Sequence, residues 1–203
     1  MHIDSATGLL RAARHVLSTH CDARPAGVAP ELVVVHGISL PPGEFGGPWI
    51  EQFFCGDLDP AGHPFFATIA GQRVSAHVLI RRDGRPVQFV PFGERAWHAG
   101  ASRWNGRDAC NDFSVGIELE GTDELPYEDA QYAALAALLR ALCATYPALR
   151  PDTVVGHSDI APGRKTDPGD SFDWPRLRRL LGDTPGVVSR DAPASRPAPD
   201  SSP

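Results

Sequence analysis

Short runs of β-branched residues that alternate with one long amphipathic segment restrict this chain to an α/β fold. Residues 32–36 and 114–120 are apolar and β-branched enough to form buried strands, and Val154-Val155 predicts a third, short strand. Between them, residues 128–146 carry apolar side chains close to a 3.6-residue period, which predicts a helix. A second helix is predicted over residues 174–181. Strands that alternate with helices favour one sheet flanked by helices.

A predicted hairpin makes the sheet mixed rather than purely parallel. Residues 74–80 form a strand pattern, and a turn at Arg82-Asp83-Gly84-Arg85 leads into the partner strand at 86–90. Residues 48–54 suggest a further short helix. We therefore expect an α/β fold of one domain, with a central mixed β-sheet flanked by helices and a metal site in a groove on one face.

The length and the C-terminal composition set the domain boundaries. The 203 residues suit one domain with a sizeable core. Residues 183–203 are rich in Pro, Ala and Ser and have too few apolar side chains to offset the entropy of ordering them. The sequence thus predicts a folded domain over residues 5–182 and a disordered tail over residues 183–203.

Charge and hydropathy exclude several classes of partner. The net charge of −6 argues against nucleic acid binding, which needs a basic face, and no apolar run is long enough to span a membrane. Residues 1–10 lack the basic start and the apolar stretch of a secretory signal, so we expect a cytoplasmic protein. The four widely spaced cysteines are then expected to be free thiols.

Two histidines at predicted strand ends suggest a metal site. His36 ends the strand at 32–36, and His157 follows Val154-Val155-Gly156. Strand ends are where ligands collect in α/β sheets. The loop after His157 holds Asp159 and Asp167, so two histidines and one aspartate would supply the three protein ligands of a catalytic zinc site. Since these residues lie far apart in the sequence, their spacing alone is weak evidence, and a polar strand terminus remains the alternative.

Three further features could carry chemistry. Glu118 and Glu120 share one face of a strand that is otherwise apolar, which suggests either a general base or a solvent-facing edge. Lys165 is the single lysine in a chain with eighteen arginines, although such a bias also arises from genome composition. Trp97-His98-Ala99-Gly100 joins an aromatic ring to small residues, a combination that suits a sugar.

Seven segments, in this order, resemble the N-acetylmuramoyl-L-alanine amidase family of the peptidoglycan-recognition-protein and phage-lysozyme type. The match is greatest to its cytosolic branch, the AmpD type, which acts on 1,6-anhydro-muropeptides, and it runs from about residue 10 to residue 181. The segments are VVVHGISLPPGEFGG (33–47), HPFF (63–66), VSAHVLIRRDG (74–84), RAWHAG (95–100), CNDFSVGIELEGTD (110–123), YEDAQY (127–132) and GHSDIAPGRKTDPG (156–169).

The resemblance implies a zinc amidase that cuts the amide bond between the lactyl group of N-acetylmuramic acid and L-alanine in cytosolic peptidoglycan fragments. It implies that His36, His157 and Asp167 hold Zn²⁺, that Glu118 is the general base and that Lys165 stabilises the oxyanion. The partner is then a small muropeptide, and we expect a monomer.

Substrate contacts are predicted at five positions. Trp97 and His98 would line the sugar pocket, Arg73 and Arg107 would hold peptide carboxylates, and Asn111 would add a hydrogen bond. Each arginine has the alternative of being an ordinary solvated surface residue.

Two positions depart from the family pattern. Gly37 stands where the family usually has Asn, and Ser158 where it usually has Cys. We expect Gly37 to remove a side chain that touches the substrate, and Ser158 to have no effect.

Three alternatives remain open. A binding module without catalysis would not need the three ligands together with Glu118 and Lys165. A secreted wall-cutting amidase would need an export signal. A hydrolase of another amide would share the metal site and would differ only in its substrate.

Overall fold

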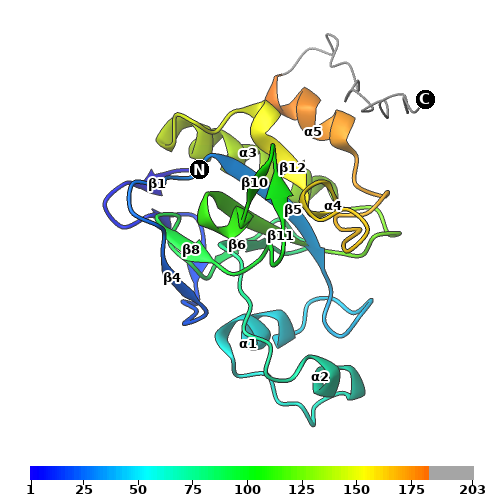
Figure 1. The fold of residues 1–203 in the computed structure, drawn as a ribbon. Coiled ribbons are helices and arrows are strands. Elements are labelled where there is room, and N and C mark those ends of the chain that lie inside the picture. Colours follow the sequence, from blue (N-terminus) through cyan, green and yellow to red (C-terminus); the bar gives the residue numbers. More distant parts are fainter. Residues whose placement is uncertain (183–203) are drawn as a thin grey trace, which may run out of the picture.

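The computed structural model describes residues 1–182, which form a six-stranded mixed sheet with helices around it (Figure 1). Its strands lie in the order β12 (Val154–Gly156), β5 (Leu32–Ile38), β11 (Ser114–Glu120), β6 (Val78–Ile80), β7 (Pro86–Gln88) and β3 (Arg14–His15). The first four are parallel, β6 and β7 pair antiparallel, and β3 is parallel to β7. The predicted mixed α/β sheet, including its hairpin, is confirmed.

Short two-stranded sheets surround this central sheet. They pair β1 (Ile3–Asp4) with β2 (Leu9–Leu10), β4 (Cys21–Ala23) with β8 (Glu94–Ala96), and β9 (Arg103–Trp104) with β10 (Arg107–Asp108). Strand β1 begins at Ile3, whose side chain is buried, two residues before the predicted start of the domain. The predicted tail, residues 183–203, lies outside the described residues.

The two longest helices form where the sequence predicts them. They are α3 (Asp129–Thr145) and α5 (Trp174–Leu181). At the start of α3, the Glu128 N–H donates to the Gln131 side chain, and at the start of α5, Asp173 accepts from the Arg176 N–H. The shorter helices are α1 (Trp49–Cys55), α2 (Pro64–Ile69), α4 (His157–Ile160) and the 3-10 turns Cys110–Asp112 and Pro151–Thr153.

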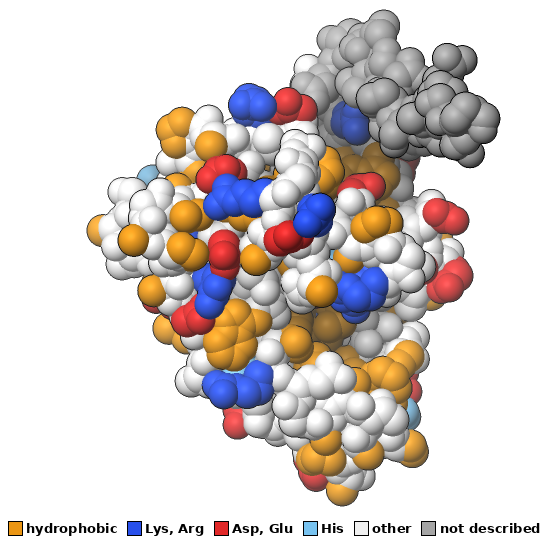
Figure 2. Space-filling view, in the orientation of Figure 1, with side chains coloured by type: hydrophobic (Ala, Val, Ile, Leu, Met, Phe, Trp, Pro, Cys, Tyr) orange, Lys and Arg blue, Asp and Glu red, His pale blue; other side chains and the backbone are white. Residues whose placement is uncertain are grey.

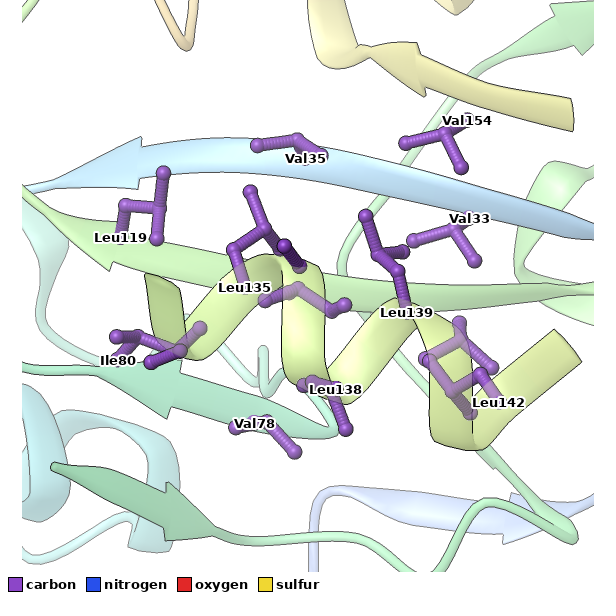
Figure 3. Close-up of a cluster of buried hydrophobic side chains, with 14 of the residues drawn as sticks. Val33, Val35, Val78, Ile80, Leu119, Leu135, Leu138, Leu139, Leu142 and Val154 are labelled. Carbon is purple, nitrogen blue, oxygen red and sulfur yellow. The ribbon is translucent and has the colours of Figure 1, made fainter. Parts of the chain in front are cut away.

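One face of the sheet is covered by α3. Leu135, Leu138, Leu139 and Leu142 of this helix pack against valines, isoleucines and leucines of β5, β11 and β6 (Figure 3). Because side chains alternate along a strand, the residues between these apolar positions point to the opposite face. His36 and Glu118 therefore lie on the face that α3 does not cover.

The sequence predicts that this strand ends at His36, but strand β5 continues through Gly37 to Ile38. Gly37 pairs with Leu119 of β11 and has the same orientation as Val33 and Val35. A Cβ atom at Gly37 would lie 2.3 Å from the Tyr127 hydroxyl oxygen. A side chain here would thus point toward Tyr127 and the α3 face, on the side of β5 opposite to His36, and the expectation that it would touch the substrate stays a prediction.

Basic and acidic side chains are interspersed on the face that Figure 2 shows. No helix within residues 1–182 is both long and apolar enough to cross a membrane. The four cysteines are free thiols in the structure, as predicted.

Candidate metal centre

Three side chains from separate elements meet at one point on the uncovered face. His36 comes from β5, His157 is the first residue of α4 directly after β12, and Asp167 lies in the loop that follows. The Nδ1 atoms of the two histidines are 3.0 Å apart, and Asp167 Oδ2 lies 3.1 Å from His36 Nδ1 and 3.0 Å from His157 Nδ1. Three atoms at such distances can each lie about 2 Å from a common point, which is the bond length of a metal to nitrogen and oxygen.

The second nitrogen of each ring is held by another group. His157 Nε2 lies 3.2 Å from the carbonyl oxygen of Ala99, so Nε2 carries the hydrogen and Nδ1 has a free lone pair. His36 Nε2 lies 2.9 Å from His98 Nδ1. Both rings therefore present Nδ1 toward Asp167, as metal ligands require.

The protonation states also fit a cation. Burial lowers the pKa of His36 to about 4, although Asp167 opposes this shift. Burial alone would raise the pKa of Asp167, but its bonds to His157 and His36 hold it well below its ordinary value. Near neutral pH, His36 is thus neutral and Asp167 ionised, which are the forms that bind a metal ion.

Glu118 lies beside this group, next to His36 in the paired strands β11 and β5. It is buried, and its Oε2 atom has no hydrogen-bond partner among the described residues. Burial, followed by the charge of Asp167, raises its pKa well above the ordinary value. A buried carboxylate with a free oxygen and a raised pKa is suited to accept a proton.

Glu120 faces the same side of β11 but has a structural environment. Its Oε1 accepts from Arg81 at 2.8 Å and from the Gly46 N–H at 2.7 Å, and its Oε2 accepts from the Arg82 N–H. The two glutamates therefore have different environments: Glu120 pairs with Arg81, whereas Glu118 has a carboxylate oxygen without a partner among the described residues.

The loop that carries Asp167 is braced on both sides. The Ser158 N–H donates to the Asp167 carbonyl at 3.0 Å, and the Tyr127 hydroxyl donates to the Pro168 carbonyl at 2.9 Å. Asp159 accepts from the Gly156 N–H at 2.7 Å, so it caps the start of α4 and is not part of the metal group. Lys165 is exposed on this loop, close enough for its charge to lower the pKa values of His36 and Glu118.

Comparison with known proteins gives the family of this chain. The family model for N-acetylmuramoyl-L-alanine amidase matches residues 26–170. The chain belongs to the N-acetylmuramoyl-L-alanine amidase family. It is 64% identical over 174 residues to the 1,6-anhydro-N-acetylmuramyl-L-alanine amidase AmpD of Salmonella typhimurium (strain SL1344), covering 86% of this chain and 92% of that protein. The Escherichia coli (strain K12) AmpD is 63% identical over the same length.

Solved structures agree with these sequence matches. A crystal structure of a selenomethionine AmpD derivative superposes with a TM-score of 0.86 at 61% identity, covering 89% of this chain and 99% of the other. A complex of AmiD from E. coli with anhydro-N-acetylmuramic acid-L-Ala-D-γ-Glu-L-Lys superposes with a TM-score of 0.55 at 32% identity, covering 77% and 60%. The family and the enzyme class that the sequence implied are confirmed.

The five positions predicted to contact substrate have different environments. Trp97 is half-buried and donates to Asp22, and the exposed Arg73 guanidinium lies 5.3 Å from the centre of its ring. Arg107 pairs with Glu31 at 3.1 Å and lies over the Phe113 ring. The other two, His98 and Asn111, face the protein: both His98 ring nitrogens have protein partners, and Asn111 Oδ1 accepts from the backbone of residues 98 and 99.

Supports of the metal ligands were not foreseen from the sequence. The Ala99 carbonyl, the His98 ring and the Tyr127 hydroxyl all hold a ligand or its loop. The segment Trp97-His98-Ala99-Gly100 stood out in the sequence only as a possible sugar contact. No local pattern marks these three groups as supports, because each acts on a residue far away in the chain.

Proposed function

We propose that this chain is a zinc-dependent amidase that hydrolyses the bond between the lactyl group of 1,6-anhydro-N-acetylmuramic acid and L-alanine. The observation that carries the proposal is the convergence of His36, His157 and Asp167 beside a buried, unpartnered carboxylate oxygen of Glu118. Two nitrogens and one oxygen from protein leave a coordination position open, which is the pattern of catalytic zinc. The AmpD relatives support the choice of substrate.

Glu118 would do the proton transfers. Zinc, when bound, supplies Lewis acidity that activates water and polarises the amide carbonyl. Glu118 accepts the proton of the attacking water through its free Oε2 atom, and then gives it to the leaving nitrogen of L-alanine. Its raised pKa suits both steps, since the group must first take up the proton and later release it.

Lys165 would stabilise the negative charge that develops on the carbonyl oxygen. It is exposed on the loop between His157 and Asp167, so its ammonium group can turn toward a bound amide. Losing one donor of this kind costs roughly 100- to 1000-fold in rate.

Trp97 and Arg73 are the proposed contacts for the sugar and for a peptide carboxylate. Trp97 is half-buried, and Arg73 makes no salt bridge among the residues the structure describes. Arg107 would be a weaker contact, because a substrate carboxylate has to compete with Glu31 for its guanidinium.

The proposed setting is recycling of peptidoglycan fragments in the cytoplasm by a monomer. Four free thiols are what a reducing compartment favours, and a net charge of −6 gives no attraction for nucleic acid. The small muropeptide is the proposed partner.

The test is hydrolysis of anhydro-muramyl-tripeptide by purified protein, followed by mass spectrometry. We expect a free peptide that begins with L-alanine. A chelator should abolish the product, and Zn²⁺ but not Mg²⁺ should restore it. Glu118→Gln, which removes the proton acceptor and keeps the size, should lower the rate by at least about 100-fold.

Glu124→Gln is the matched control, since Glu124 is exposed and the substitution is chemically the same. It should leave the rate unchanged. Binding of the tripeptide without cleavage, even with zinc supplied, would favour the binding-module alternative and remove the roles of Glu118 and Lys165. Cleavage of a different amide only would keep the metal site and reject the substrate.

A further inference from the structure

His98 and Ala99 touch both histidines of the metal centre. The His98 ring contacts His36 Nε2 at 2.9 Å, and the carbonyl of Ala99 accepts from His157 Nε2 at 3.2 Å. One dipeptide thus lies behind both ligands, on the side away from Asp167. We call residues 98 and 99 the backing dipeptide.

The hydrogen bonds through His98 have one consistent direction. If His36 offers the Nδ1 lone pair to a metal, its hydrogen is on Nε2 and donates to His98 Nδ1. The hydrogen of the neutral His98 ring is then on Nε2 and donates to Ser114 Oγ at 3.1 Å. Ser114 is fully buried in β11, so this chain of bonds ends on a fixed, uncharged group.

The sheet leaves room for the His98 ring. A Cβ atom at Gly116 would lie 2.4, 2.6 and 2.7 Å from three atoms of this ring, closer than atoms can approach. Gly116 is therefore the residue that makes room for the His98 ring against β11, between Ser114 and Glu118 on the same face.

The backbone of the backing dipeptide is also fixed. Asn111 Oδ1 accepts from the N–H groups of His98 at 3.1 Å and of Ala99 at 2.8 Å. Arg164 donates to the same Ala99 carbonyl at 2.7 Å. These bonds hold a carbonyl and a ring at set positions, although the segment itself forms no helix or strand.

We infer that His98 and Asn111 are positioning residues, which fix the tautomer and the orientation of both histidine ligands, and that they are not substrate contacts. The inference rests on the metal role proposed above. It assigns His98 as the acceptor of the His36 Nε2–H, and Asn111 as the anchor of the backing dipeptide. The hydrogen bonds from His36 through His98 end on the Ser114 hydroxyl and not on a carboxylate. They therefore add no negative charge to the ligand set, in which Asp167 is the anionic group.

The first test measures zinc affinity by competition with a chromophoric chelator. His98→Ala removes the acceptor and should weaken zinc binding about 10- to 100-fold. His98→Asn keeps an oxygen where Nδ1 lies, so it should recover a substantial part of that loss. His63→Asn is the matched control: His63 caps α2 through its Nδ1, which the Asn oxygen can replace, and zinc affinity should not change.

Asn111 is tested with a second pair of variants. Asn111→Ala leaves two N–H groups without their acceptor and should weaken zinc binding, whereas Asn111→Asp keeps that acceptor and should bind more tightly than Asn111→Ala. Cobalt(II) absorption provides a second readout, because displaced ligands change the visible bands of the bound ion. The melting temperature of each metal-free variant shows whether it is folded.

Wild-type zinc affinity in folded His98→Ala would overturn the inference. A raised KM for the tripeptide at unchanged zinc affinity would instead make His98 a substrate contact. If the wild-type protein binds zinc but cleaves no muropeptide, the proposed function fails while the affinity series still tests the positioning role. If His98→Ala weakens zinc binding and the wild type cleaves, both stand.

Discussion

Gly116→Ala should disturb the metal centre by adding one methyl group that displaces the His98 ring, the partner of the ligand His36. The new Cβ would lie 2.4 Å from His98 Cγ, and normal contact requires at least about 3.4 Å, so the ring has to move by roughly 1 Å. His98 Nδ1 lies 2.9 Å from His36 Nε2. A movement of about that size changes the length or the angle of this bond and weakens it.

We expect zinc affinity to fall about 10- to 100-fold, because a metal ligand loses its orienting partner. Overpacking at this site should also lower the free energy of unfolding by about 1–3 kcal/mol. Zinc affinity is measured by chelator competition, and stability by urea unfolding of the metal-free protein followed by circular dichroism.

Gly93→Ala is the matched control, since no atom lies within 4 Å of the position of its Cβ and its backbone has no positive φ. It should bind zinc and unfold as the wild type does. If Gly116→Ala retains full zinc affinity, the ring can move without effect on His36, and the argument for His98 loses its geometric basis.

Three other predictions concern stability. His77 Nδ1 accepts from the Gly116 N–H, and burial lowers the pKa of His77 to about 3. The contribution of His77 to stability should therefore be fully present above the unfolded pKa near 6.5 and fall by about 2 kcal/mol at about pH 5, so His77→Asn should lose about 2 kcal/mol less than the wild type on acidification to about pH 5 in urea titrations of the metal-free protein. Tyr127→Phe leaves the Pro168 carbonyl without its donor and should cost about 1–3 kcal/mol; an unchanged urea midpoint would mean that this bond does not brace the loop. Leu138→Ala, in the core, should cost about 2–5 kcal/mol, whereas Leu17→Ala, at a 59% exposed position, should stay within about 0.5 kcal/mol; equal effects in thermal melts would contradict the assigned core.

The elements that the sequence predicts best depend on local signals. The helix over residues 174–181 matches α5 because Asp173 caps it and Gly182 ends it in the left-handed region. The strand over 114–120 matches β11 because it is apolar, β-branched and followed by Gly121. In both cases the residues that decide the boundary lie inside the segment or next to it.

Prediction fails where a distant partner decides the structure. A glycine usually interrupts a strand. At Gly37, however, β5 stays paired with β11 before and after the glycine, and Tyr127 takes the space of the missing side chain. The pairs β1–β2 and β9–β10 have two residues per strand, which is too short for a periodic pattern. His98 likewise meets His36 only because the fold brings residues 62 positions apart together.

One face of β11 links these observations. Residues 114, 116, 118 and 120 all point to the metal side, since side chains alternate with period two. The first receives the hydrogen bond of His98, the second makes room for that ring, the third presents the proposed base, and the fourth binds Arg81. A slip of one residue would place Val115, Ile117 and Leu119 there instead and would bury the carboxylates against α3. The apolar packing on α3 therefore sets the register on which the proposed chemistry depends.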